Sequence, residues 1–332
     1  MCNVRTCESK VFRGGRATDN GSSPYLGDAS KCPLCGELVR PEKRLKTRIG
    51  RFPISIGNCR KCRLAVQSPQ VTPELSGEYM NWRWASTDPD DRYVTDSQEK
   101  SRKSIQDLEW LSQFSFPVRS VLDVGAGSGA FCAAAESAGW EEATGIEIST
   151  RAIKRAKDTY GVTLVNQDIS SMPDAPTFGL VTMWDVIEHL RNPLQALQQA
   201  YARLVPGGMI LVETGNYECM ARLAEGRHWD LYLLDHMFYF TPNSLKSIIE
   251  RAGFKNFVLH RRAPRASAGF EPKKSVKALS KKITRIVGNP RLVSRIPHKL
   301  FKIARTPFAK RRAMRLWPDH WNISFLLATG EK

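Results

Sequence analysis

The stretch VLDVGAGSGAF, residues 121–131, decides the fold because it joins a buried strand to a glycine-rich turn. A nonpolar run ends around Asp123, and glycines follow at alternate positions, Gly125, Gly127 and Gly129. Glycine has no side chain, so the backbone can approach a ligand closely where a strand passes into a helix. An ordinary tight turn is the alternative, but three alternate glycines after an acid favour a ligand site.

The spacing of these glycines narrows the choice of ligand. The dinucleotide fingerprint is GxGxxG, whereas here the third glycine comes one residue earlier. An acid just before the glycines is poorly suited to a pyrophosphate and suits a cationic or hydrogen-bond-donating ligand. Glu147 ends the next predicted strand, where a carboxylate can accept hydrogen bonds from both hydroxyls of a ribose. Asp168 follows the third strand, where it could bind an adenine amino group or be an ordinary surface acid.

Strand-like and helix-like segments alternate from residue 118 onward. This pattern predicts an α/β fold with a doubly wound, mostly parallel sheet that helices cover on both faces. In the helix 97–113, Ile105, Leu108 and Leu111 are the nonpolar positions, and Thr241 is the expected N-cap of a later helix. The predicted strands are 120–124, 143–148, 162–168, 178–186, 209–214, 254–260 and 322–332, and the predicted helices are 97–113, 129–138, 149–161, 192–207 and 241–253.

Four of the eight cysteines form two close pairs, CPLC at 32–35 and CRKC at 59–62. Each CxxC turn directs two thiolates toward one point, and two such turns complete a tetrahedral zinc site. Redox use of the thiols is the alternative. Four thiolates would close the coordination shell, so we expect a structural zinc held by Cys32, Cys35, Cys59 and Cys62.

Five motifs in order carry a resemblance to class I S-adenosylmethionine-dependent methyltransferases: DVGAGSG (123–129), GIEIS (145–149), NQDI (166–169), WDVIEHLRNP (184–193) and LVPGG (204–208). The resemblance covers about residues 118–262 and the last strand. It implies a Rossmann-like methyltransferase core with S-adenosylmethionine as cofactor. The residues that it assigns to the cofactor are Asp123, Gly125, Ala126, Gly127, Gly129, Glu147, Ile148, Asp168, Ile169, Trp184 and Asp185.

Methyl transfer to oxygen benefits from a base near the acceptor, which directs attention to two histidines. His189 follows the fourth strand of the predicted core, and His236 lies between the fifth strand and the next helix. The stretch around Asp235 and His236 resembles the Glu-His stretch that carries the base in some sugar methyltransferases, with Asp in place of Glu. The candidate catalytic residues are therefore His236, His189 and Asp235, and the alternative is a histidine packed to hold a lid.

The net charge of +17 is concentrated near the C-terminus, because residues 261–332 hold 19 Lys and Arg against three acids. The segment 264–318 reads as a basic helical insertion before the last strand. Its mixture of Lys/Arg with nonpolar residues suits an anionic membrane surface, and nucleic acid or a solvated cover over the active site are the alternatives. No signal peptide or membrane span is evident, so we expect a cytoplasmic protein, at most peripheral at the inner membrane face.

The sequence thus predicts six regions: a disordered N-terminus (1–30), a zinc ribbon (31–70), a linker and helical lead-in (71–117), the methyltransferase core (118–263), the basic insertion (264–318) and a final core strand (319–332). A zinc ribbon joined to such a core resembles a bacterial subset that acts on sugars, polysaccharides and other small molecules. We therefore expect O-methylation of a sugar, glycan or lipid-linked intermediate. An RNA or protein methyltransferase and a non-catalytic binding or scaffold protein are the alternatives.

Overall fold

The computed structural model describes residues 25–47, 52–85, 97–175, 177–219, 222, 225–260 and 325–332. Six strands form its central sheet in the order β11-β12-β9-β8-β6-β7. Strands β7, β6, β8 and β9 run parallel, and β12 is antiparallel to both β9 and β11. The bounds are β6 Ser120–Val124, β7 Glu142–Ile146, β8 Phe178–Trp184, β9 Leu204–Gly215, β11 Lys255–His260 and β12 Phe325–Glu331. The predicted α/β, mostly parallel sheet is therefore confirmed.

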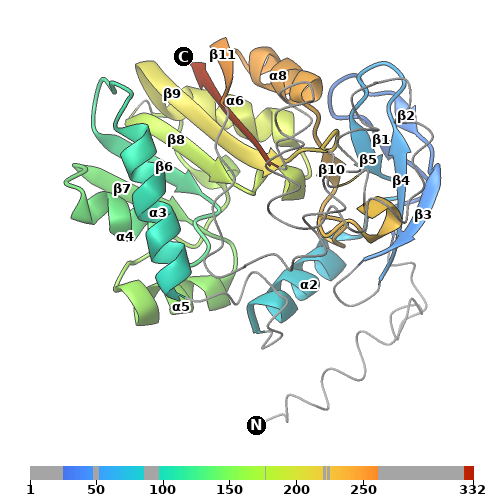
Figure 1. The fold of residues 1–332 in the computed structure, drawn as a ribbon, viewed down its shortest axis with the longest axis horizontal. Coiled ribbons are helices and arrows are strands. Elements are labelled where there is room, and N and C mark those ends of the chain that lie inside the picture. The colour runs from blue at the N-terminus through green and yellow to red at the C-terminus, as the bar shows by residue number, and fades with distance from the viewer. Residues whose placement is uncertain are drawn as a thin grey trace, which may run out of the picture.

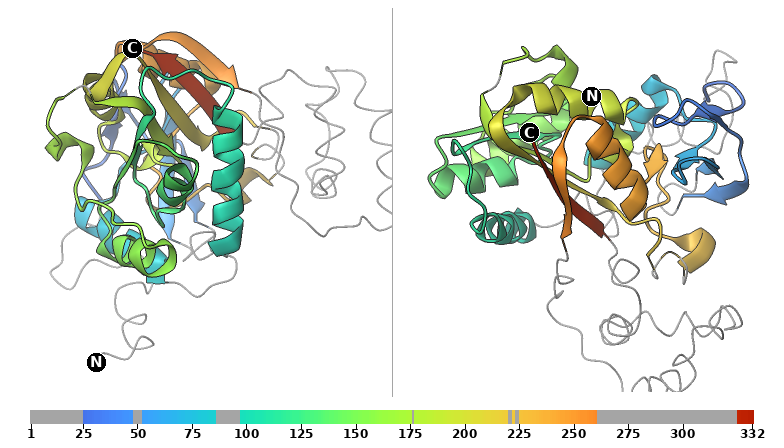
Figure 2. Two further views of the ribbon diagram at one scale, coloured as in Figure 1. Left: turned by 90° about the vertical axis from the view of Figure 1, so that its left-hand side faces the viewer. Right: turned by 90° about the horizontal axis from the view of Figure 1, so that it is seen from above.

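Helices cover both faces of this sheet (Figures 1 and 2). On one face, α3 (Ser97–Leu111), α4 (Ala130–Ser137) and α5 (Thr150–Tyr160) are neighbours. On the other face lie α6 (Pro193–Arg203) and α8 (Pro242–Arg251). The predicted N-cap of α8 is confirmed, since Thr241 accepts from Ser244 N in a capping box.

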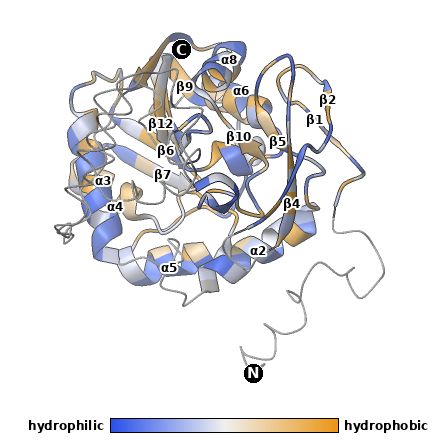
Figure 3. Ribbon diagram, turned by 45° about the vertical axis from the view of Figure 1, so that its right-hand side comes forward, coloured by the Kyte–Doolittle hydropathy of each residue, from blue (hydrophilic) through white to orange (hydrophobic). Residues whose placement is uncertain are grey.

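Alternate residues of each strand enter two separate cores. Val121, Leu180 and Leu211 pack under α3 and α4, whereas Leu122 and Val181 pack under α6 and α8. This period of two is what a sheet covered on both faces requires. Figure 3 shows the contrast between these nonpolar strands and the largely polar helix α3.

Three local expectations differ from the structure. Helix α6 ends at Arg203, not near Gly207, because β9 already begins at Leu204. In the predicted strand 162–168, the described residues form a single parallel bridge, between Val165 and Ile146. Ile105 is 53% exposed, although Leu108 and Leu111 on the same helix are buried as predicted.

The N-terminal strands form two small sheets beside the central one (Figure 1, blue). Strands β1 (Ser30–Lys31) and β2 (Leu38–Val39) pair with each other. A second sheet has the order β10-β5-β4-β3, with β3 Lys43–Lys46, β4 Pro53–Asn58, β5 Ala65–Gln67 and β10 Phe238–Tyr239. Tyr25, which falls within the predicted disordered N-terminus, forms a bridge with Val71.

The stretch that reads as a linker contains a helix, α2 (Pro73–Ala85). It has no continuous nonpolar stripe, yet Tyr79 and Arg83 are buried one turn apart. The predicted basic insertion at 264–318 and residues 1–24 lie outside the described residues. Within the described part of the chain, no helix has the length and nonpolar character needed to cross a bilayer.

Candidate functional site

The glycine loop after β6 has a backbone that side chains would disturb. Gly125, Gly127 and Gly129 have φ angles of +67°, +56° and +75°, which other residues rarely adopt. A Cβ atom on Gly125 would lie 2.7 Å from Cγ2 of Val186, and one on Gly129 would lie 2.9 Å from Cβ of Ala156. The loop is therefore packed tightly against the end of β8 and against α5.

Glu147, directly after β7, holds this loop through its carboxylate. Its Oε2 accepts a hydrogen bond from Gly127 N at 2.9 Å, and its Oε1 accepts one from Ser149 N at 2.8 Å. Burial raises the pKa of Glu147, and the backbone N–H groups work against that rise. Each carboxylate oxygen can accept more than one hydrogen bond, so the arrangement leaves capacity for two ligand hydroxyls.

Three further predicted residues flank Glu147. Ile148 is 58% exposed. Asp168 is exposed and its Oδ1 accepts from Ser170 N at 2.8 Å, while Ile169 is buried. Ile148 therefore offers a nonpolar surface near the loop, with a carboxylate on the next chain segment.

Asp123 is buried inside the sheet, where Thr182 Oγ1 donates a hydrogen bond to its Oδ1 at 2.7 Å. Burial raises the pKa of this carboxyl to about 7, and the nearby charge of Glu147 adds to the rise. Its contact with a ligand stays a prediction. Ala126, also predicted, donates its backbone N–H to Ile146 O at 3.0 Å, which joins the loop to β7.

The end of β8 carries the other predicted cofactor residues, Trp184 and Asp185. The Trp184 ring lies 5.4 Å from the ring of Phe131, and Lys103 Nζ lies 5.6 Å from its centroid. Asp185 has a φ angle of +54°, a left-handed conformation that costs energy for any residue but glycine. Such strain is concentrated at functional sites, so the backbone of Asp185 supports its assignment to the site independently of the sequence motif.

A buried cluster of charged side chains lies next to the glycine loop. It unites the three predicted catalytic residues with Glu188 of the short helix η3 (Ile187–His189) and Arg83 of α2. His189 Nδ1 lies 3.3 Å from Asp235 Oδ2, and Arg83 Nη1 lies 3.9 Å from the same oxygen. The rings of His189 and His236 are 4.6 Å apart, edge to face.

These groups shift one another's pKa values. Burial alone would lower the pKa of His189, but the charge of Asp235 outweighs it and raises that pKa to about 9. Burial likewise opposes ionisation of Asp235, but His189 and Arg83 hold its pKa below the usual range. For His236, burial and the neighbouring charge of His189 both act to keep the pKa well below its ordinary value. The cluster thus contains an ion pair, Asp235 with His189, beside a neutral imidazole.

Two side chains of this site, Arg83 and Trp84, were not predicted from the sequence. Arg83 reaches Asp235, and Trp84 stands against the glycine loop, 3.4 Å from where a Cβ of Gly127 would be. Both lie in NWRW, residues 81–84, whose aromatic character was the available signal. The contact partners lie far away in the chain, so a local pattern could not identify them.

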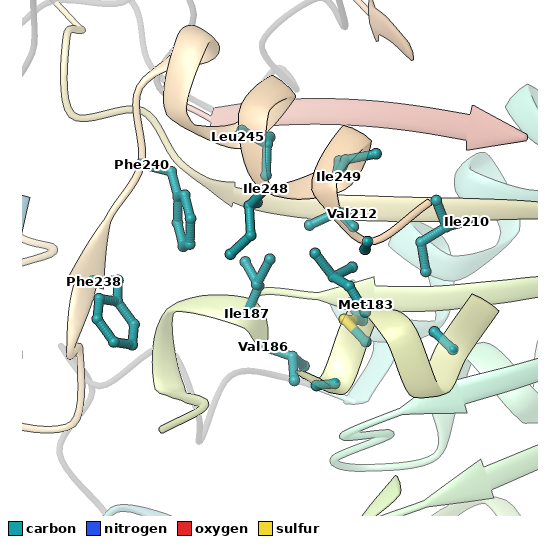
Figure 4. Packing of buried hydrophobic residues seen from close by; sticks show 14 of the residues in the cluster. Met183, Val186, Ile187, Ile210, Val212, Phe238, Phe240, Leu245, Ile248 and Ile249 are labelled. Atoms are coloured by element: carbon teal, nitrogen blue, oxygen red, sulfur yellow. The ribbon is translucent and has the colours of Figure 1, made fainter. Parts of the chain in front are cut away.

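Nonpolar packing connects the cluster to the surrounding core. Figure 4 shows Val186 and Ile187, which directly precede Glu188, near Phe238 and Phe240 and below α8. The same nonpolar core includes Leu64 and Val66 of the N-terminal module, as we call the strands β1 to β5 and the turns between them. The buried cluster of charged side chains is therefore held between the central sheet and the N-terminal module.

The four predicted metal-binding cysteines come together in the N-terminal module. Their Sγ atoms all lie within 4.8 Å of one another, and those of Cys35 and Cys59 are 3.5 Å apart. The two turns are alike: Gly36 N donates to Cys32 O, and Arg63 N donates to Cys59 O, both at 2.8 Å. Gly36 and Arg63 both have a positive φ. Four sulfurs at such separations fit the tetrahedral shell of Zn²⁺.

This module is joined to the rest of the chain by backbone pairing. Strand β10, which follows the buried cluster, pairs with β5, with Phe238 opposite Val66. Gln67 N donates to Met237 O at 2.9 Å, and Arg251 donates to Leu34 O. The turn with Cys59 and Cys62, between β4 and β5, therefore belongs to the same sheet as β10, which directly follows Asp235 and His236.

Comparison with known proteins gives a family match for the central part. Residues 96–258 match the family model described as "Methyltransferase domain". A tRNA U34 carboxymethyltransferase of Pseudoalteromonas translucida is 30% identical over 174 residues, which cover 45% of this chain and 52% of the relative. A ubiquinone biosynthesis O-methyltransferase of Psychrobacter arcticus is 28% identical over 152 residues, which cover 41% of this chain and 59% of that protein.

The chain therefore spans only about half the length of these curated relatives. Among solved structures, an S-adenosylmethionine-dependent methyltransferase from Archaeoglobus fulgidus is similar with a TM-score of 0.47 and 18% identity. That match covers 70% of this chain and 94% of the other.

Proposed function

We propose that this protein transfers a methyl group from S-adenosylmethionine to a small-molecule acceptor, because residues 96–258 match the methyltransferase-domain family model. The observation that carries the proposal is the position of Glu147, whose carboxylate bridges the amides of Gly127 and Ser149. A carboxylate that can accept hydrogen bonds therefore lies directly beside a loop in which Gly125, Gly127 and Gly129 carry no side chain.

The residues present suit S-adenosylmethionine. Glu147 would accept from the ribose hydroxyls, Ile148 would cover one face of the adenine, and Asp168 and Ile169 would border its edge. The backbone of the glycine loop, with Trp184 and Asp185 of β8, would surround the methionine portion. When bound, the cofactor supplies an electrophilic methyl group on a sulfonium, so the protein's main tasks are orientation and exclusion of water.

The acceptor side is proposed to lie near the segment between β9 and α8. Tyr217, Trp229, Tyr232 and Tyr239 gather there in one aromatic cluster. The hydroxyl of Tyr239 is buried and has no hydrogen-bond partner among the described residues. This favours an acceptor with both a ring and polar groups, such as a sugar, a glycan or a lipid-linked intermediate.

We also propose distinct roles for the three predicted catalytic residues. Asp235 is fully buried and paired with His189, so it acts as a positioning residue for that imidazole. His236 is the neutral imidazole and the sequence-based candidate for the base. The four-cysteine site is proposed to bind a structural Zn²⁺, since four thiolates leave no position open for a substrate.

The alternative acceptor is RNA, which the similarity to the tRNA U34 carboxymethyltransferase supports over about half of that relative's length. A protein acceptor has similar support from the ribosomal protein L11 methyltransferase of Shewanella piezotolerans, 32% identical over 105 residues. Binding of RNA that falls steeply with salt concentration would favour the first of these. We also propose that the protein is cytoplasmic and that segment 264–318 contacts an anionic membrane surface.

Isothermal calorimetry with S-adenosylmethionine and its demethylated product tests the proposal. We expect micromolar affinity for both in a zinc-loaded sample, followed by methyl transfer in a screen of hydroxylated acceptors. A folded protein that binds neither compound would instead support a non-catalytic scaffold.

A further inference from the structure

A second group of metal-ligating side chains lies in the buried cluster, apart from the cysteines. Glu188, His189 and His236 each offer one ligand atom, and these three atoms lie within 4.8 Å of one another. Met237 N donates to Glu188 O at 2.8 Å, which ties together the two chain segments that carry the ligands. This backbone hydrogen bond therefore fixes the separation of the two segments that carry the three side chains.

The orientation of His189 suits a ligand. Its Nδ1 lies 3.0 Å from the backbone oxygen of Asp235 and 3.3 Å from Oδ2 of the same residue. A carbonyl oxygen can only accept, so Nδ1 carries a proton and Nε2 is the nitrogen left for a metal. A carboxylate or carbonyl behind a ligating imidazole is the usual arrangement in metal sites, because it fixes the ring and its tautomer.

The other two ligands also have unmet capacity. Oε2 of Glu188 is buried and has no hydrogen-bond partner among the described residues. A carboxylate oxygen in that position is costly unless a proton or a cation satisfies it. The backbone of Leu231 acts as a hydrogen-bond partner of His236, and an imidazole has a second ring nitrogen that can bind a metal ion.

The local charge favours a divalent cation. Asp185, Glu188 and Asp235 each bring a carboxylate to this region, while Arg83 brings one guanidinium. A bound metal ion would displace one proton of His189, and the three carboxylates would then outnumber the guanidinium by two. One divalent ion would balance that difference in a place from which water is largely excluded.

We propose that Glu188, His189 and His236 bind one divalent transition-metal ion, with Co²⁺ as the spectroscopic probe. Two imidazoles and one carboxylate suit Zn²⁺ or Fe²⁺ better than Mg²⁺ or Ca²⁺, which prefer oxygen ligands. Three protein ligands leave a coordination position open, as in catalytic zinc sites. Val186 lies two residues before Glu188 in the chain, and its side chain packs against Gly125 of the glycine loop. The proposed metal site is therefore close to that loop.

The open position would take the acceptor oxygen, and this part of the inference rests on the proposed methyltransferase activity. The ion would favour loss of the acceptor's proton to solvent. The acceptor oxygen would then form the new C–O bond with its electron pair, while the C–S bond of the sulfonium breaks and sulfur keeps its pair. His236 is in this view a metal ligand, in place of the general base that the sequence suggests.

Cobalt substitution in the full chain tests the site. The metal-free protein is reloaded with Co²⁺, and metal content and the visible spectrum are recorded for wild type, Glu188→Gln and His236→Asn. We expect two Co²⁺ per chain in wild type, of which one lacks a thiolate-to-cobalt charge-transfer band. Each variant should retain the thiolate site and bind the second ion at least tenfold more weakly. His260→Asn changes a histidine that pairs with Thr329 outside the cluster, so it should keep both ions.

A wild-type protein that binds a single Co²⁺, all of it on thiolates, would overturn the proposal, as would a second ion that both variants bind normally. Since two variants and the wild-type spectrum are read separately, poor folding of one variant leaves the test intact. Calorimetry with S-adenosylmethionine is run on the same samples. Loss of cofactor binding with two ions present would refute the methyltransferase activity and leave the metal site standing.

Discussion

The backbone N–H of Gly127 donates a hydrogen bond to Oε2 of Glu147, 2.9 Å away, across the ends of two neighbouring strands. The carboxylate thus shapes the glycine loop before any ligand is present. The same residue serves two tasks, because its remaining lone pairs are the proposed partners of the ribose. A change at Glu147 should therefore alter both the loop and cofactor affinity.

Replacing Glu147 by Ala should weaken binding of S-adenosylmethionine by roughly ten- to a hundredfold, since hydrogen bonds to a charged group contribute about 1.5–3 kcal/mol. Calorimetry measures the dissociation constant directly. The matched control is Glu142→Ala at the start of β7, at an exposed residue that accepts from Thr144 Oγ1. Equal affinities for the Glu147→Ala variant and wild type would refute the assignment of the ribose to Glu147.

Gly125→Ala should destabilise the protein more than Gly161→Ala. Both glycines have a positive φ, +67° and +73°, so both substitutions add a conformational strain of about 1 kcal/mol. A Cβ on Gly161 meets nothing within 4 Å, whereas one on Gly125 lies 2.7 Å from Val186, whose branched side chain cannot turn away easily. Overpacking should add about 1–3 kcal/mol to the cost at Gly125, measured by urea unfolding.

A double-mutant cycle with Val186→Ala isolates that contact. If the clash is the cause, the second substitution should recover part of the loss, with a coupling free energy of about 1 kcal/mol or more. Additive effects of the two substitutions would mean that the backbone moves instead.

The sheet and its helices could be predicted because their signals are local. Every second residue of a strand enters the same core, as Leu122 and Val124 do in β6. The cap of Thr241 bonds a backbone N–H only three residues later. Helix α2 could not be predicted in this way. Its buried positions include Arg83, whose burial depends on Asp235, a residue about 150 positions later.

The same reasoning explains which parts of the candidate site were found. Glu147 and the glycines belong to a motif whose spacing reflects a strand–turn–helix unit. The pairing of β5 with β10 joins segments about 170 residues apart, and no pattern within either segment predicts this pairing. For that reason the sequence suggested a separate zinc ribbon, whereas the structure shows a module that shares a sheet with the chain segment of His236.

Removal of zinc should lower the stability of the whole described fold and not of the N-terminal module alone. The cysteine turns and the central sheet contribute to one nonpolar core, which includes Cys59 and Phe238. A loss of about 3 kcal/mol would lower Tm by roughly 6–12 °C in a single transition. Calorimetry before and after chelation measures this, and Cys62→Ser should reproduce it.

Cys132→Ala is the control for loss of a thiol, because Cys132 lies in α4 outside the four-cysteine cluster. It should keep its zinc. A chelated protein with unchanged Tm, or one in which the module melts separately, would contradict the shared core.

Asp123→Asn should change the pH dependence of stability. Burial raises the pKa of Asp123 to about 7 in the folded protein, above its unfolded value of 3.8. The folded state therefore retains a proton that the unfolded state has lost, so this residue's contribution to stability is greatest below pH 4 and decreases as the pH rises to 7. Asparagine cannot ionise, and its amide oxygen can still accept from Thr182.

The free energy of unfolding of the Asp123→Asn variant, relative to wild type, should thus rise between pH 4 and 7 and level off above it, by a total on the order of 4 kcal/mol. Urea unfolding at pH 4, 5, 6, 7 and 8 without cofactor gives the two curves. Asp158→Asn, an exposed change on α5, should leave the curve parallel to wild type. Parallel curves for Asp123→Asn as well would show that Asp123 is ionised in the folded protein, as a carboxylate that waits for a cationic ligand would be.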